Sequence, residues 1–202
     1  TVGVFTRESP FRKTVLHGRV NEWLKKDSSI HDNPCRKEAV KGRIGNVPPY
    51  MDLSGLFPGD ETEVFGQRKK VKVYFPFGNF GVDDSNFYTR PAYLRSYGYS
   101  CLEVPEEETA KFELSACGAL TVWLNDELVT DYVPFQRNRE QSAVISMPLR
   151  KGTNKLVVCL EDLAERDTAF HYKVRYLGTQ NIRMKIRVKE ETDPETIMKA
   201  ED

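Results

Sequence analysis

Apolar and polar residues alternate over short segments between Lys70 and Val188. The segments 71–75, 109–115 and 142–149 have the period of two that is typical of strands with one buried face. Further strands are predicted over residues 92–104, 120–124, 127–129, 155–160, 170–177 and 182–188. About seven to nine strands at this spacing, with little helix, predict an all-β fold, either an antiparallel β-sandwich or a barrel.

Two turns join these strands. Asn125 and Asp126 lie between two strand-like runs, and both residue types tolerate the positive φ that a two-residue hairpin requires. Lys151–Asn154 forms the second turn, ahead of an almost wholly apolar strand. Trp123 lies in mid-strand just before the hairpin, so we expect its ring to be buried or half-buried.

The two ends of the chain differ from this regular part. Residues 1–60 are predicted to be an irregular N-terminal segment, which is either one strand of the sandwich with a long loop or a remnant of a neighbouring unit. The sandwich itself is predicted over residues 61–189. Residues 190–202 form a charged tail or the start of a linker helix with Pro194 at its first position. We therefore expect the chain to be a piece of a longer protein.

Composition excludes some partners. With 202 residues, 39% of them hydrophobic, the chain can fill one main core. Its 30 basic and 30 acidic residues balance, which argues against binding nucleic acid or an anionic membrane surface. No run reaches the roughly 18 to 20 apolar residues of a membrane helix. The four cysteines have no CxxC spacing, so we expect reduced core thiols and a cytoplasmic setting, with export left open.

One part of the sequence resembles a known family. The run Phe112–Val129, which contains Val-Trp-Leu-Asn-Asp, is followed by Met147–Val158 with its Lys-Gly-Thr-Asn turn. These segments resemble the galactose-binding-like jelly-roll sandwich domains found beside the catalytic domains of many glycoside hydrolases. The likeness covers about residues 70–178, and Asp126 stands where that family usually has glycine.

The resemblance implies a function as well as a fold. It implies a noncatalytic accessory module of a larger carbohydrate-active protein, which packs against and shapes a catalytic domain of the same polypeptide. In that family the catalytic acids lie in the separate domain, so the resemblance transfers no catalytic residue and no cofactor to this chain. The motifs encode a hairpin and a turn more than a site.

The residues themselves offer little support for an enzyme. Glycoside hydrolysis needs two facing carboxylates, and the neighbouring acids at 83–84 and 161–162 point to opposite faces of any strand, so we expect both pairs to lie in solvated loops. The charged segment 161–168 is expected to be an insert in which Asp167 caps a loop or pairs with Arg166. His17, His31 and His171 are scattered and have no metal-site spacing, so we expect a structural hydrogen-bonding role for His171.

The aromatic loop from Tyr74 to Arg90 is the candidate ligand site. Its rings could stack on sugar faces while polar side chains bind the hydroxyl groups, and the alternative is that the rings fill the core or pack on a neighbouring domain. This second function, an autonomous carbohydrate-binding module, competes with the accessory role. The residues predicted to bind are Phe77, Phe80, Asp83, Asn86, Tyr88 and Arg90.

Overall fold

The computed structural model describes residues 2–7, 48–64, 67–74, 81–132 and 138–185. Within these ranges the chain forms strands and turns and no helix, and therefore no helix that could span a membrane. The described strands are β1 (Val2–Arg7), β2 (Glu61–Val64), β3 (Gln67–Lys70), β4 (Lys72–Val73), β5 (Gly81–Asp83), β6 (Asn86–Val104), β7 (Glu108–Cys117), β8 (Ala119–Leu124), β9 (Glu127–Tyr132), β10 (Gln141–Leu149), β11 (Gly152–Thr168), β12 (His171–Tyr176) and β13 (Arg183–Lys185).

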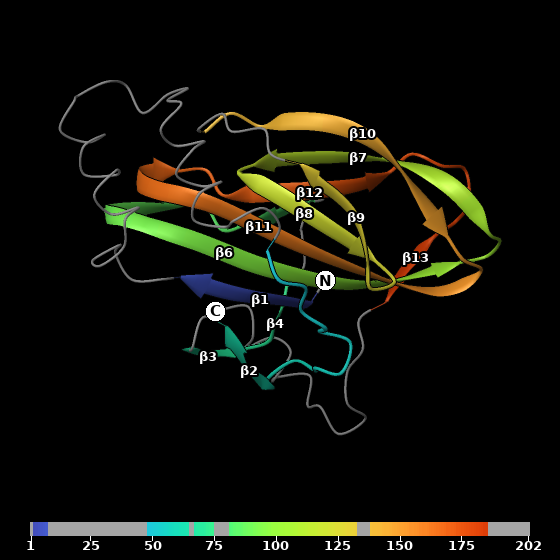
Figure 1. Ribbon diagram of the computed structural model, residues 1–202, viewed down its shortest axis with the longest axis horizontal. Coiled ribbons are helices and arrows are strands. Elements are labelled where there is room, and N and C mark those ends of the chain that lie inside the picture. The colour runs from blue at the N-terminus through green and yellow to red at the C-terminus, as the bar shows by residue number, and fades with distance from the viewer. Residues whose placement is uncertain (1, 8–47, 65–66, 75–80, 133–137, 186–202) are drawn as a thin grey trace.

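Two antiparallel sheets pack face to face (Figure 1). The large sheet has seven strands in the order β4-β1-β6-β11-β8-β9, with β13 also paired to β6. The small sheet has four strands in the order β10-β7-β12-β5, and β2 and β3 form a separate pair. The predicted antiparallel β-sandwich is confirmed.

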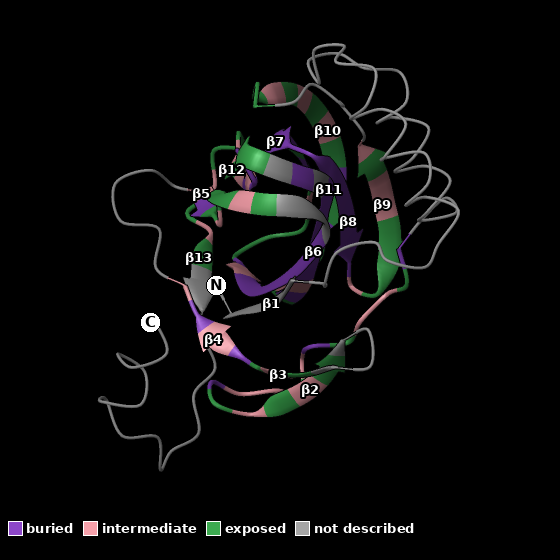
Figure 2. Cartoon of the chain, turned by 90° about the vertical axis from the view of Figure 1, so that its left-hand side faces the viewer, coloured by how far each residue is buried: buried purple, intermediate pink, exposed green. Residues whose placement is uncertain are grey.

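The main core fills the space between the sheets. Along β7 the side chains of Phe112 and Leu114 point inward, as their alternation predicts, and they meet Leu120 and Val158 from the large sheet. Figure 2 shows the buried stretches of β6, β7 and β8 toward the middle of the molecule. At Gly118 the chain passes from the small sheet to the large one within a single residue, at a φ of 120°.

A second cluster of buried residues covers the outer face of the large sheet. Tyr97, Trp123 and Cys159 point to this side, where Leu53 and Val71 pack on them. Trp123 is 4% exposed, which confirms its predicted burial. The segment around Leu53 therefore covers part of the outer face of the large sheet. Cys101, Cys117 and Cys159, the cysteines among the described residues, are buried and form no disulfide, as expected.

The hairpin prediction is also confirmed. Asn125 and Asp126 have φ values of 51° and 72° and connect β8 to β9.

The prediction that the acidic pair at 161–162 lies in a solvated loop was wrong. Glu161 and Asp162 lie inside β11 and are 1% and 2% exposed, where a solvated loop was expected.

The reason is the length of β6, which continues to pair with β11 beyond the apolar stretch. The ladder runs from Gly152 opposite Val104 to Thr168 opposite Asn86, with one irregularity between Ala164 and Arg166. Segment 161–168 is therefore strand, and the charged insert predicted there does not exist.

Candidate functional site

The outer face of the small sheet carries a line of polar side chains. Tyr172 and Val174 of β12 point into the core, so His171, Lys173 and Arg175 point outward. The strand register places Asp83 of β5 opposite His171, and Ser115 of β7 opposite Lys173. Residues opposite each other in a sheet share a face, which brings these side chains from three strands together.

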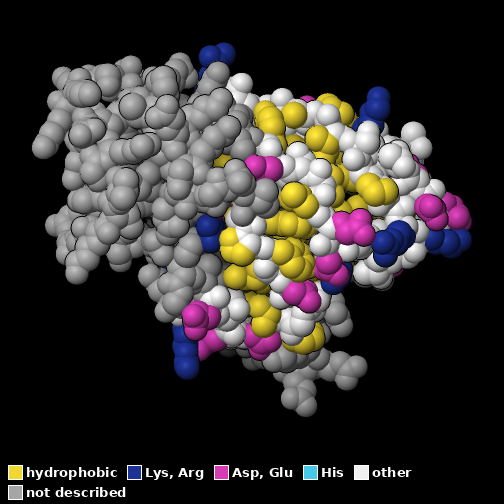
Figure 3. All heavy atoms as spheres, viewed as in Figure 1, with side chains coloured by type: hydrophobic (Ala, Val, Ile, Leu, Met, Phe, Trp, Pro, Cys, Tyr) yellow, Lys and Arg dark blue, Asp and Glu magenta, His cyan; other side chains and the backbone are white. Residues whose placement is uncertain are grey.

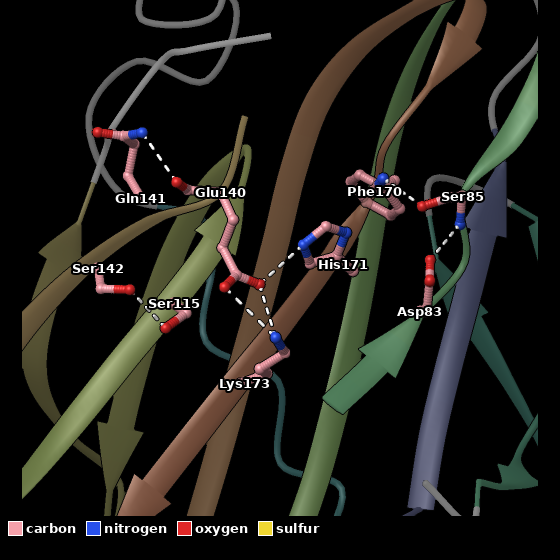
Figure 4. Close-up of polar contacts among 9 residues, drawn as sticks. All are labelled: Asp83, Ser85, Ser115, Glu140, Gln141, Ser142, Phe170, His171 and Lys173. Atoms are coloured by element: carbon pink, nitrogen blue, oxygen red, sulfur yellow. Dashed lines mark hydrogen bonds and ion pairs between the residues drawn. The ribbon is translucent and has the colours of Figure 1, made fainter. Parts of the chain in front are cut away.

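Glu140 joins two of these side chains. His171 Nε2 lies 3.0 Å from its Oε2 atom, and Lys173 Nζ lies 2.9 Å from the same oxygen. Figure 4 shows both side chains pointing at the carboxylate. Partial burial disfavours the charged form, but the hydrogen bond and charge of Lys173, with the His171 contact, outweigh it and lower the pKa of Glu140. The cluster thus holds an ionised carboxylate at neutral pH.

Further polar contacts continue the surface across β7 and β10. The hydroxyls of Ser115 and Ser142 lie 2.7 Å apart, and Arg175 Nη2 lies 2.7 Å from Glu113 Oε2. Figure 4 places the serine pair on one side of Glu140 and Asp83 on the other. The result is a strip of alternating donors and acceptors across the sheet.

The loop between β5 and β6 fixes the Asp83 end of this strip. The Ser85 N–H donates to Asp83 Oδ1 at 2.9 Å, and the Phe170 N–H donates to Ser85 Oγ at 2.9 Å. The Asp84 N–H in turn donates to the Phe170 carbonyl at 2.9 Å. Because these hydrogen bonds tie the loop to Phe170, the residue just before β12, the carboxylate is held in place before any ligand arrives.

The structure brings only part of the predicted ligand site to this surface. Asp83 is exposed on the small sheet, and Asn86 is exposed at the first position of β6. Tyr88 is half-buried with its ring packed on the core, as in the alternative of core-filling rings. Arg90 lies in β6, where only its backbone is described, and Phe77 and Phe80 lie outside the described residues.

Of the residues in the polar strip, sequence reasoning predicted only Asp83 as a ligand-binding residue and missed His171, Lys173 and Glu140 in that role. The alternation of residues 170–176 already places His171 and Lys173 on one outward face, so this signal was present. The predicted hydrogen-bonding role of His171 is confirmed by its contact with Glu140. Glu140 itself precedes β10, and nothing in its sequence neighbourhood links it to β12. His17, His31 and Cys35 lie outside the described residues.

The neighbouring acids Glu161 and Asp162 do not face each other. Glu161 Oε1 is ion-paired with Arg95 Nε at 2.6 Å under the outer face of the large sheet. Asp162, the next residue in the strand, points to the opposite face. Among the described residues no group of three or more His, Cys, Asp or Glu is placed to hold a metal.

No protein-family model and no curated protein matches the sequence. Among solved structures, a family 35 carbohydrate binding module from an environmental isolate matches at 16% identity and a TM-score of 0.34, over 55% of this chain and 81% of that one. A β-glucosidase from Kluyveromyces marxianus matches at 18% identity and 0.34, over 48% of this chain and 13% of the enzyme. Its complex with glucose matches at 16% identity and 0.32, over 46% and 12%. Similarities with identities and TM-scores this low do not show which family the chain belongs to.

Proposed function

We propose that this chain is a noncatalytic β-sandwich module of a carbohydrate-active protein, and that it binds glycan on the outer face of the small sheet. The observation that supports the proposal is the polar strip, in which Asp83, His171 and Lys173 share one face with Glu140. Carboxylates accept hydrogen bonds from sugar hydroxyls, while ammonium and imidazole N–H groups donate to them. The strip offers both within one surface.

The strip is also preorganised for binding. The His171, Lys173 and Glu140 side chains are 22%, 31% and 33% exposed, so each is partly fixed by packing and still reaches solvent. Ordering flexible side chains opposes binding by roughly 0.5 to 1.5 kcal/mol each, and a fixed cluster avoids much of that loss. In this proposal Phe77 and Phe80, just ahead of β5, add rings that stack on the sugar.

The accessory role predicted from the sequence stays a second proposal. Phe87 favours it, because this ring is 57% exposed at the start of β6. In this second proposal the ring of Phe87 contacts a neighbouring domain, such as the catalytic domain of the same polypeptide. The two proposals are compatible, since Phe87 is not part of the polar strip.

Binding should be screened on an array of neutral gluco-, galacto-, xylo- and manno-oligosaccharides and measured by calorimetry for the best of these. We expect His171→Ala and Lys173→Ala each to weaken binding about tenfold, since each removes a hydrogen bond to a charged or polar partner. Arg68→Ala is the matched control, because Arg68 is 86% exposed in β3, outside both sheets of the sandwich.

Two outcomes would count against the proposal. The first is glycan binding that is equally strong in the wild type and in the double variant H171A/K173A. The second is hydrolysis of a nitrophenyl glycoside by the rigorously purified chain, because a noncatalytic module has no turnover.

A further inference from the structure

Among the described strands, β10 is an edge strand with little of the usual protection against pairing. Among the described strands it pairs only with β7, in an unbroken register from Gln141 opposite Ala116 to Leu149 opposite Glu108. Natural edge strands are commonly blunted by charged side chains, proline, bulges or very short length. Of these features β10 has one proline, Pro148, next to the last residue of the strand. β10 has nine residues, no bulge and no charged side chain, and its Val144 is 57% exposed.

The position of Pro148 indicates which backbone groups face the open edge. Proline has no N–H, so within a sheet it is placed where that group would point away from the ladder. The N–H and C=O groups of an antiparallel strand alternate in direction along the chain. Ser142, Val144 and Ser146 therefore direct their backbone groups to the open edge, where an added strand would bind them.

A pocket lies beside the second half of β10. It has a volume of about 540 Å³ and is bounded by Ser146, Pro148 and Leu149 on one side and by β9 and the end of β8 on the other. Among the described strands, β9 is at the edge of the large sheet and β10 is at the edge of the small sheet, so the pocket lies between two edge strands. Figure 3 shows hydrophobic side chains gathered on the described part of the molecular face, with acidic side chains among them.

The lining of the pocket selects the chemistry of an occupant. Its apolar side chains are Leu124, Leu128, Val129 and Leu149, and Leu128 is 50% exposed. Its charged side chains are three carboxylates, Glu107, Glu108 and Glu127, against the single cation Arg150. The apolar floor suits aliphatic groups, and the excess of carboxylates favours a basic partner.

We propose that the open side of the sandwich between β9 and β10 binds an extended, basic peptide segment of a partner protein. The segment adds to β10 as a further strand through the backbone of Ser142, Val144 and Ser146. Its alternate side chains are aliphatic toward the pocket floor, and its lysine or arginine side chains meet Glu107 and Glu127. Main-chain hydrogen bonds supply affinity in this mode of recognition, and the side-chain pocket supplies specificity.

The test uses fluorescent peptides of nine residues and the full chain. The probe alternates valine and lysine, one control peptide alternates valine and glutamate, and a second control is the lysine peptide with N-methylated backbone amides. By fluorescence anisotropy we expect the lysine peptide to bind at least tenfold more tightly than either control. Its affinity should fall as salt is added, because the attraction is between exposed charges.

Matched variants separate the contribution of the main-chain hydrogen bonds from that of the charges. Val144→Pro removes one edge-facing N–H and should weaken peptide binding at least tenfold, whereas Val144→Thr keeps that group and should bind normally. The double variant E107Q/E127Q should weaken binding of the lysine peptide and flatten its salt dependence, with thermal unfolding as the check on folding. H171A/K173A should bind the peptide normally, so failure of the glycan proposal and failure of this one are distinguishable.

Three results would overturn the proposal. They are equal binding of the lysine and glutamate peptides, unchanged binding by a folded Val144→Pro variant, and sedimentation that shows a dimer formed through β10 in a chain that binds no peptide. The last result would assign the edge to a second copy of the chain, because an uncharged strand can also pair with itself.

Discussion

Asn125 and Asn154 hydrogen-bond to each other, and this contact joins the two turns that the sequence singled out. Asn125 Nδ2 donates to Asn154 Oδ1 at 2.9 Å, while Asn125 Oδ1 accepts from the Lys155 N–H at 2.9 Å. Asn154 is fully buried and also donates to the Arg150 carbonyl at 2.7 Å. The hairpin after β8 and the turn before β11 are thus locked together at one end of the sandwich.

Replacing Asn154 by alanine should destabilise the protein by about 2 to 4 kcal/mol, because it leaves buried backbone and amide groups without partners. Asn125→Gly should have a smaller effect, since glycine keeps the positive φ and only the side-chain bonds are lost. Urea unfolding followed by tryptophan fluorescence measures both. A loss at Asn125 that exceeds the loss at Asn154 would contradict this account of the contact.

The buried pair of Arg95 and Glu161 gives a second prediction. Their side chains are 7% and 1% exposed, so removing one partner leaves a charge in a low-dielectric environment. We expect Glu161→Leu alone to destabilise by about 3 to 5 kcal/mol, and the double variant R95M/E161L to recover most of that loss. A double-mutant cycle of unfolding free energies tests this. Simple additivity of the two single changes would show that the pair does not act as a unit.

Gly118 is the third position with a definite expectation. Its φ of 120° lies in a region that side chains avoid, and a Cβ atom there would meet the Glu161 carbonyl oxygen at 2.8 Å. Gly118→Ala should therefore destabilise by about 2 to 4 kcal/mol. Gly55→Ala is the control, because a Cβ at Gly55 has no neighbour within 4 Å and should change stability by less than about 1 kcal/mol. Thermal unfolding of both variants measures the difference between Gly118 and Gly55.

The Glu140 carboxyl group should make the stability of the folded protein depend on pH. Because its pKa is lower in the folded protein than in the unfolded chain, its ionised form favours folding. This contribution is complete above the unfolded value of about 4.3 and is lost as the pH falls through the lower folded pKa. The difference in Tm between wild type and Glu140→Gln should thus be largest near neutral pH and shrink below about pH 4. A difference that stays constant from pH 7 to pH 3 would rule out this linkage.

The local pattern of the sequence was sufficient for the fold. Alternation around Phe112 and Leu114 predicted the inward face of β7, and Asn125 with Asp126 predicted the hairpin, because side-chain direction in a strand and turn conformation depend on near neighbours. The same local rule failed at Glu161, where charged residues suggested a loop. A strand's burial there depends on its partner β6, which is distant in sequence and cannot be read from residues 161–168.

The candidate surfaces were decided by tertiary structure. The sequence predicted Asp83 and Asn86 as ligand-binding residues and a hydrogen-bonding role for His171. Only the sheet register brings Asp83 opposite His171, and only the fold brings Glu140 to Lys173. Likewise, the sequence shows an uncharged strand over residues 141–149, and only the sheet order shows that it is an edge beside an acidic pocket. Sequence patterns report the period of a strand, whereas strand order and register come from contacts between distant residues.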